Sequence, residues 1–351
     1  MTQHSSKFPS EAEVVIVGVG GIVGSMLAYW LAELGQKNIV GLEKSTIIPS
    51  DIASTAHASD FVYNTTHDKL GCWATNFSRK FYEDNGFFLK KGGLEICRKD
   101  DDARWEELKR KVESGKAFGT NIKLISASEA KEKFPLLDEE SIRGAMWDPD
   151  AGLVTPRSQD VVNFAVESAK EKGALSTFTD TPAVGFEIEN GRVTGVKTDK
   201  GTIKTKKVVI ASGIWGPLMG DMAGVPVPLM PVEHPLLFFG PLPEIQGTDE
   251  FLVYPLLRDQ GNSAYVRDTG RLHGGMLEWG YYEDKEPRLV DPEDIGNPEK
   301  TMISDSMRYL DLEEVAEPLE KAFETTPILN ELGWDEKSSF NGLLSVTPDA
   351  G

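Results

Sequence analysis

The amino-acid sequence predicts an α/β fold with a second domain of α+β type, and three observations support this. A β-branched run at residues 14–17 precedes a glycine-rich turn, a helix pattern and a second short strand, which is a β–α–β start. Another buried strand ending in glycine stands far along the chain, at residues 208–213. Between residues 226 and 279, prolines and aromatic residues accompany β-rich segments. We therefore expect a parallel-sheet domain built from separated segments, with an antiparallel-sheet domain inserted into it.

The chain length agrees with two domains, because a single hydrophobic core rarely grows to 351 residues. We expect the parallel-sheet domain to comprise residues 1–90, 145–225 and 335–351. The inserted domain then comprises residues 91–144 and 226–334.

The opening β–α–β unit is the best-defined local pattern. A strand at 14–17 leads to a helix over 25–34, which Gly35 ends, and to a second strand at 38–42. Further elements are predicted in this order: a helix within 61–88, charged helical segments over 98–134, a helix over 159–172, a β-meander through 191–203, and helices over 292–332.

Composition excludes several classes of protein. The formal net charge is −19, and Lys and Arg do not cluster, so the sequence argues against nucleic-acid binding. No apolar stretch is long enough to span a bilayer, and residues 1–10 lack the apolar core of a secretory signal. Cys72 and Cys97 are expected to be reduced thiols. We therefore expect a cytoplasmic protein, or a mitochondrial matrix protein in a eukaryote.

The glycine turn after the first strand predicts a Rossmann-like dinucleotide-binding domain. Such a turn brings backbone N–H groups and a helix N-terminus close to a diphosphate. Glu43, at the tip of the second strand, is placed to bind ribose hydroxyl groups. The spacing is one residue longer than G-x-G-x-x-G, so either the turn bulges or its working glycines are Gly18, Gly21 and Gly24. No metal site is predicted, because His4, His67 and His273 lack ligand spacing.

The string Ser54-Thr55-Ala56-His57-Ala58 has no place in a plain nicotinamide-binding fold. It resembles the S-T-x-H-A segment of the dimethylglycine and sarcosine dehydrogenase/oxidase family, within the glycine-oxidase-like flavoenzymes. The Pro231-to-His234 segment is also specific to that family. More general flavoenzyme segments match at residues 42–44, 92–95, 134–137, 191–196, 211–215, 340–342 and 347–349.

The resemblance implies an FAD domain roofed by the inserted sheet, with His57 bonded covalently to the flavin. A neutral imidazole is a nucleophile that can add to the electron-poor methyl group of the isoalloxazine. With the glycine turn, the predicted cofactor-binding residues are Gly18, Gly20, Gly21, Ile22, Val23, Gly24, Glu43, Lys44, Ser54, Thr55, Ala56, His57, Phe61, Ala183, Gly213 and Trp215.

His234 and Tyr265 match the catalytic histidine and tyrosine of the family. An amine must lose its proton before hydride transfer, and a histidine with a pKa near 7 can accept that proton. The tyrosine hydroxyl can orient the histidine or bind the substrate carboxylate. If residues 264–267 form a strand, Arg267 points the same way as Tyr265 and is a weaker candidate for a carboxylate clamp.

The implied activity is oxidative demethylation of a small N-methylated amino acid, with oxygen or an electron-transfer flavoprotein as acceptor. Two departures concern the substrate: Asp60 stands near a place where the family usually has glycine, and Pro235-Leu236 follows the histidine where the family often has Gln-Tyr. The flavin-contacting elements expected after residue 351, and a folate-binding module found in relatives, are not part of the sequence, so we expect a truncated chain. Alternatives are a non-catalytic FAD-binding subunit of a larger complex, an oxidoreductase acting on another secondary or tertiary amine and, more distantly, a nicotinamide dehydrogenase.

Overall fold

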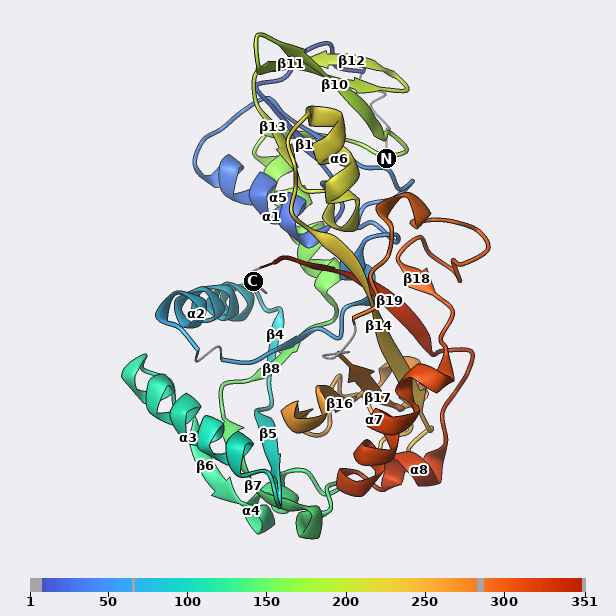
Figure 1. Ribbon diagram of the computed structural model, residues 1–351. Coiled ribbons are helices and arrows are strands. Elements are labelled where there is room, and N and C mark those ends of the chain that lie inside the picture. The colour runs from blue at the N-terminus through green and yellow to red at the C-terminus, as the bar shows by residue number, and fades with distance from the viewer. Residues whose placement is uncertain (1–7, 65–66, 283–286, 349–351) are drawn as a thin grey trace.

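The computed structural model describes residues 8–64, 67–282 and 287–348. It confirms the predicted α/β fold, with a parallel sheet in one part of the molecule and a larger, mainly antiparallel sheet in the other (Figure 1). Within the described ranges, no helix has the length and apolar character needed to cross a membrane.

The parallel sheet has the strand order β13-β1-β2-β9. Strands β1 and β2 are completely buried, as expected for a sheet covered on both faces. Helices α1 and α5 pack on one face and contribute Ala28 and Val162 to the core there. The elements are β1 (Val14–Val17), β2 (Ile39–Leu42), β9 (Leu175–Phe178), β13 (Val208–Ile210), α1 (Ile22–Glu33) and α5 (Ser158–Glu171).

The predicted meander covers the other face of the parallel sheet together with a short helix (Figure 1). It comprises β10 (Ala183–Glu189), β11 (Arg192–Thr198) and β12 (Gly201–Lys204), and the helix is α6 (Gly216–Ala223). A small sheet links the two parts of the molecule. It comprises β3 (Phe61–Val62), β8 (Gly152–Val154) and β4 (Phe88–Lys90), with helix α2 (Lys69–Asp84) beside it.

The large sheet has nine strands in the order β18-β19-β14-β17-β16-β15-β5-β7-β6. Only β15 and β5 pair in parallel. Strand bounds are β5 (Gly93–Arg98), β6 (Lys123–Ser126), β7 (Ile142–Asp148), β14 (Met230–Phe239), β15 (Leu256–Asp259), β16 (Ala264–Asp268), β17 (Leu277–Tyr281), β18 (Met307–Arg308) and β19 (Phe340–Val346).

One face of this sheet carries the largest core, with helices α4 (Ala127–Lys133), α7 (Leu312–Thr325) and α8 (Ile328–Leu332) packed on it. Helix α3 (Asp102–Ala117) covers the far end of the opposite face. The rest of that opposite face points toward the parallel-sheet domain. Strand β19 pairs with β14 along seven residues, so it belongs to the large sheet, whereas we had predicted residues 335–351 with the parallel-sheet domain.

Two predicted helical regions contain other structure. Within residues 98–134, β6 separates α3 from α4, and the capping box of Ser126 and Glu129 starts α4. Within residues 292–332, helix begins only at Leu312, because the segment before it makes turns and the short strand β18. Short 3₁₀ turns complete the chain: Ser54–His57, Glu139–Ser141, Gly213–Trp215, Gln260–Asn262, Leu272–Gly274 and Pro292–Asp294.

Candidate active site

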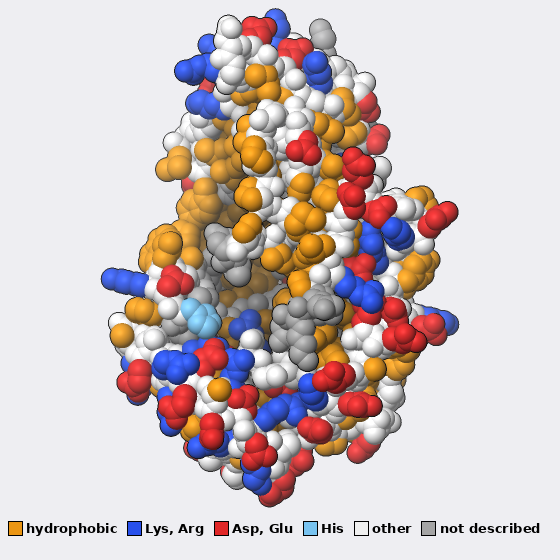
Figure 2. Space-filling view, in the orientation of Figure 1, with side chains coloured by type: hydrophobic (Ala, Val, Ile, Leu, Met, Phe, Trp, Pro, Cys, Tyr) orange, Lys and Arg blue, Asp and Glu red, His pale blue; other side chains and the backbone are white. Residues whose placement is uncertain are grey.

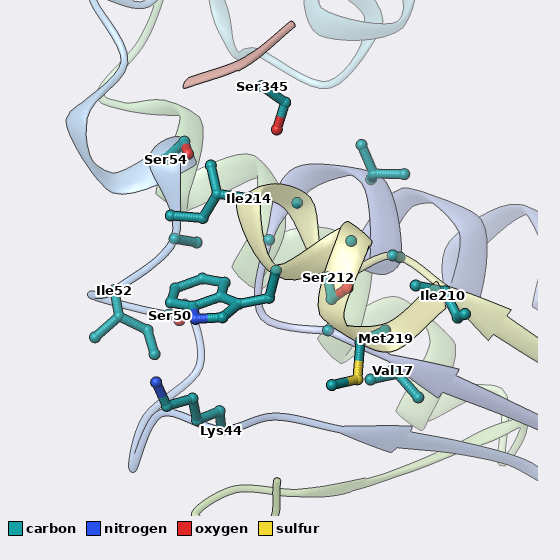
Figure 3. A pocket seen from close by; sticks show the side chains of 18 of the residues that line it. Val17, Lys44, Ser50, Ile52, Ser54, Ile210, Ser212, Ile214, Met219 and Ser345 are labelled. Carbon is teal, nitrogen blue, oxygen red and sulfur yellow. The ribbon is translucent and has the colours of Figure 1, made fainter. Parts of the chain in front are cut away.

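A cavity of about 570 Å³ lies at the carboxyl ends of the parallel strands. Figure 3 shows side chains reaching it from β1, the residues after β2, the turn after β13, helix α6 and β19. This edge is where α/β sheets bind their ligands. The predicted residues in its wall are Gly18, Gly21, Ile22, Val23, Glu43, Lys44, Ser54, Thr55, Ala183, Gly213 and Trp215. The others, Gly20, Gly24, Ala56, His57, Phe61, His234 and Tyr265, do not line it.

Each glycine of the turn has a different structural role. Gly18 has a φ of +93°, and an added Cβ would lie 2.5 Å from the Ala211 oxygen. A Cβ on Gly24 would lie 2.1 Å from the Gly18 oxygen, so the helix packs directly under the turn. Gly21 caps α1 and faces the cavity, whereas Gly20 lies under Glu43. This geometry favours the second reading of the long spacing, with Gly20 as the additional residue.

Glu43 is buried at the end of β2, and its carboxylate organises the neighbouring turns. It accepts hydrogen bonds from Gly20 N (2.9 Å), Ser45 N (2.9 Å) and Ser50 Oγ (3.1 Å). Burial raises the pKa of Glu43, although these hydrogen bonds act in the opposite direction. The next residue, Lys44, pairs with Asp305 at 2.6 Å and lies 4.9 Å over the Trp215 ring.

His57 ends the Ser54–His57 turn, whose first two residues line the cavity. Thr55 Oγ1 accepts from Ile22 N at the start of α1 (3.1 Å), which ties this turn to the helix N-terminus. The half-buried His57 ring has its Nε2 3.3 Å from Ser304 Oγ and its centroid 5.8 Å from that of Phe340. Burial, and then the positive charge of Arg157, lower the pKa of His57 to about 4, so the ring is neutral at pH 7.

Arg157 holds the segment that follows His57. Its Nε lies 2.5 Å from an Asp60 oxygen, and its Nη2 donates to the carbonyls of Ala56 (3.3 Å) and Ala58 (3.1 Å). Asp60 also accepts from Ser158 N (3.1 Å) at the start of α5. The φ of Asp60 is +61°, in the region that glycine adopts most easily. This explains how a residue that departs from the family pattern can fit here: the buried carboxylate binds Arg157 and the helix start.

A cluster of polar side chains lies on the face of the large sheet that points toward the parallel-sheet domain. His234 Nε2 is 2.9 Å from the Tyr265 hydroxyl, which is 2.8 Å from Ser59 Oγ. The ring of Tyr282 stacks on that of His234 with centroids 4.3 Å apart. The structure therefore brings the two predicted catalytic residues together and joins them to the His57 segment through Ser59.

Gly280 makes this arrangement possible. It lies between His234 and Tyr265 on β17, directly opposite both Leu236 of β14 and Tyr265 of β16. A Cβ at Gly280 would lie only 2.1 Å from Tyr265 Cζ and 2.2 Å from its hydroxyl oxygen. The tyrosine can reach His234 only because residue 280 has no side chain.

Two expectations about this group need correction. Burial lowers the pKa of His234 to about 4, although the Tyr281 backbone and the Glu278 charge partly oppose this, so a pKa near 7 was wrong. Arg267 is buried and its guanidinium is 2.7 Å from Glu278, the residue opposite it on β17. It shares a sheet face with Tyr265, as predicted, but its partner makes it a poor carboxylate clamp.

Several residues of this region belong to no sequence motif, and only their contacts in the structure reveal them. They are Ser59, Arg157, Gly280 and Tyr282. Cys72 and Cys97 are both buried free thiols. In the described ranges no group of three or more His, Cys, Asp or Glu side chains could hold a metal ion, and His4 and residues 349–351 lie outside these ranges.

We expect Gly280→Ala to push the Tyr265 ring away from His234 and to lower the free energy of unfolding by about 1–3 kcal/mol. Urea unfolding measures this change. The matched control is Gly342→Ala on β19, where an added Cβ would meet atoms no closer than 3.5 Å. Equal effects of the two substitutions would contradict the proposed close approach.

Stability should fall as the pH is lowered from about 6.5 to about 4, in part because of His234. Its pKa is about 4 in the folded protein and 6.5 in a model peptide, so the unfolded chain binds more protons between these values. One such histidine contributes at most about 1.4 kcal/mol per pH unit. Urea unfolding across this range should give a shallower slope for His234→Gln, and an unchanged slope for His67→Gln, whose side chain is exposed.

Known proteins of similar sequence include FAD-dependent oxidoreductases, as the geometry of the cavity suggests. The family model "FAD dependent oxidoreductase" (DAO) matches residues 13–351. Human mitochondrial sarcosine dehydrogenase is 29% identical over 362 residues, and human mitochondrial dimethylglycine dehydrogenase is 28% identical over 351. Each alignment covers 98% of this chain, but only 36% and 39% of the relative's length, respectively. The chain therefore spans less than two fifths of these relatives.

A solved structure has the same architecture. L-proline dehydrogenase from P. horikoshii superposes with a TM-score of 0.79 at 28% identity, covering 97% of this chain and 83% of that one. The cavity suits the cofactor of the family, because its wall combines a helix N-terminus, a close-packed glycine turn and a buried carboxylate. The chain belongs to the family of FAD-dependent oxidoreductases and is homologous to the sarcosine and dimethylglycine dehydrogenases.

Proposed function

We propose that this protein oxidatively demethylates a small N-methylated amino acid such as dimethylglycine or sarcosine. The observation that carries the proposal is the hydrogen-bonded line from Ser59 through Tyr265 to His234. It begins two residues beyond His57, on the segment that also lines the cofactor cavity. Hydrogen-bonding side chains that could accept a proton from an amine thus lie next to the place where we expect the flavin ring.

Different residues of the cavity would bind different parts of FAD. The N–H groups of Gly21 and Val23 at the start of α1 would hold the diphosphate, and Glu43 would bind ribose hydroxyls. The Ile22 N–H between them is already bonded to Thr55 Oγ1. Gly18, Gly20 and Gly24 shape the turn, while Lys44, Ala183, Gly213 and Trp215 form the wall around the rest of the nucleotide. Ser54, Thr55, Ala56 and Phe61 belong to the segment that would lead to the flavin ring, and His57 would form the covalent bond to it.

When bound, the flavin supplies the acceptor for a hydride from the N-methyl carbon. The oxidised substrate is an iminium ion, which water converts to formaldehyde and the demethylated amine. Oxygen or an electron-transfer flavoprotein would be the final electron acceptor.

The protein side chains prepare the amine for this step. The neutral His234 ring adds no positive charge to the site and so does not oppose the charge that develops on the amine nitrogen. The Tyr265 hydroxyl lies between His234 and Ser59, so a proton released by the amine can move along this line. With a pKa of about 4, His234 relays that proton and does not retain it.

Anaerobic mixing with dimethylglycine or sarcosine should bleach the flavin absorbance of the FAD-loaded protein. Tyr265→Phe removes the relay hydroxyl and should slow bleaching at least about tenfold, without loss of bound flavin. Stopped-flow absorbance gives both quantities, and Tyr309→Phe is a control, since Tyr309 is exposed. A protein that binds FAD but is bleached by no N-methylated amino acid would instead be a non-catalytic flavin-binding subunit or an oxidase of another amine.

The covalent link has its own test. Flavin fluorescence should stay with the denatured protein on a gel, and His57→Ala should remove it while FAD still binds non-covalently. His273→Ala is the matched control, because His273 also has a pKa lowered by burial but stands elsewhere, against Phe238. Fluorescence that survives His57→Ala would assign the link to another residue.

A further inference from the structure

A hairpin that ends in β18, residues 301–308, lies between the large sheet and the cofactor cavity. Within it, Met302 N donates a hydrogen bond to Met307 O (2.9 Å). Its second half is fixed to β19, because Leu343 N donates to Ser306 O (2.8 Å). Figure 1 shows this part of the chain, around β18, on the side of the large sheet that is nearer to the parallel-sheet domain. The large sheet therefore sets the position of the hairpin.

The turn of the hairpin contacts a loop that forms one wall of the cavity, residues 43–57, which we call the wall loop. Seven residues of this loop line the cavity: Glu43, Lys44, Ser50, Ile52, Ala53, Ser54 and Thr55. Ser304 Oγ donates to Asp51 O (2.9 Å), and Asp305 Oδ2 lies 2.6 Å from Lys44 Nζ. Residues 301–308 themselves do not line the cavity. The hairpin therefore holds the wall loop from outside the cavity.

Asp305 fixes the Lys44 side chain against the cavity wall. The same amine that pairs with Asp305 lies 4.9 Å from the ring centroid of Trp215, on the far side of the sequence. In Figure 3 the Lys44 nitrogen points toward Ile52, another residue of the wall loop. Gly296 leaves room for the carboxylate, because an added Cβ there would lie 3.1 Å from Asp305 Cγ. One carboxylate thus joins the hairpin to two segments of the wall.

We propose that Asp305 is a positioning residue that retains FAD, with the hairpin 301–308 acting as a strap across the wall loop. The inference goes beyond the proposed function and rests only on FAD binding. A bound cofactor leaves when a wall of its site moves, so contacts that hold the wall lower the rate of release. The side chains of Lys44 and Asp305 are 49% and 27% exposed, so salt screens their attraction. Release of FAD should therefore become faster as the ionic strength rises.

The test measures FAD release in a His57→Ala background, where the proposed covalent link cannot form. The loaded protein is diluted, and the recovery of FAD fluorescence gives the rate of release. Asp305→Asn should speed release about two- to fivefold and should weaken its dependence on salt. Asp294→Asn is the matched control, because Asp294 pairs with Lys300 in the same segment and contacts no residue of the wall loop. This control should release FAD at the rate of the parent.

Charge exchange distinguishes a specific ion pair from general loosening of the hairpin. Asp305→Lys should speed release more than Asp305→Asn, because it places two positive charges together. Adding Lys44→Asp should return the rate toward that of the parent. A second measurement needs no cofactor: in urea unfolding of the apoprotein, Lys44→Met and Asp305→Asn should have non-additive effects.

The outcomes separate this inference from the proposed function, because no amine substrate is present. Faster release from Asp305→Asn than from Asp294→Asn supports the strap even if no N-methylated amino acid bleaches the flavin. Equal release from these two variants would overturn the inference. If the His57→Ala proteins retain no FAD, the unfolding measurement decides, and additive effects of Lys44→Met and Asp305→Asn would overturn it.

Discussion

The buried Asp60 and the half-buried Arg157 form an ion pair that fixes the segment on which the two parts of the site meet. Arg157 stands just before α5 and also holds the backbone on both sides of His57. One end of this segment is tied to the N-terminus of α1 through Thr55, and the other end reaches β16 through Ser59. Because a buried charge without its partner is strongly unfavourable, the pair constrains the path of the whole segment. The hollow between the two parts of the molecule is visible in Figure 2, with hydrophobic side chains gathered along it.

Burial decides the chemical character of both histidines. Each loses hydration that would stabilise its charged form, so each has a pKa of about 4. For His57 a nearby guanidinium adds to the effect, whereas for His234 the neighbouring negative charge of Glu278 opposes it. A neutral ring is the nucleophilic form, and it is also the form that tolerates a developing positive charge beside it. The same physical cause would therefore serve both proposed tasks, flavin attachment by His57 and proton transfer by His234.

Close backbone approach is the second constraint on the site. Gly24 lets α1 pack against the turn at Gly18, which brings the helix N-terminus to the cavity. Gly280 lets the Tyr265 ring cross β17 and reach His234. In both places the missing side chain decides which atoms can meet, so function depends on residues that touch no ligand.

The sequence by itself determined the α/β class, the opening β–α–β unit and the residues around the cavity, because these depend on local periodicity and on short motifs. By resemblance, it also predicted roles for His57, His234 and Tyr265. It could not identify Arg157 or Gly280, whose roles arise from contacts between segments about 15 to 100 residues apart. It misjudged Arg267 and the pKa of His234 for the same reason. A charge partner and the extent of burial are properties of packing, and only the tertiary structure decides them.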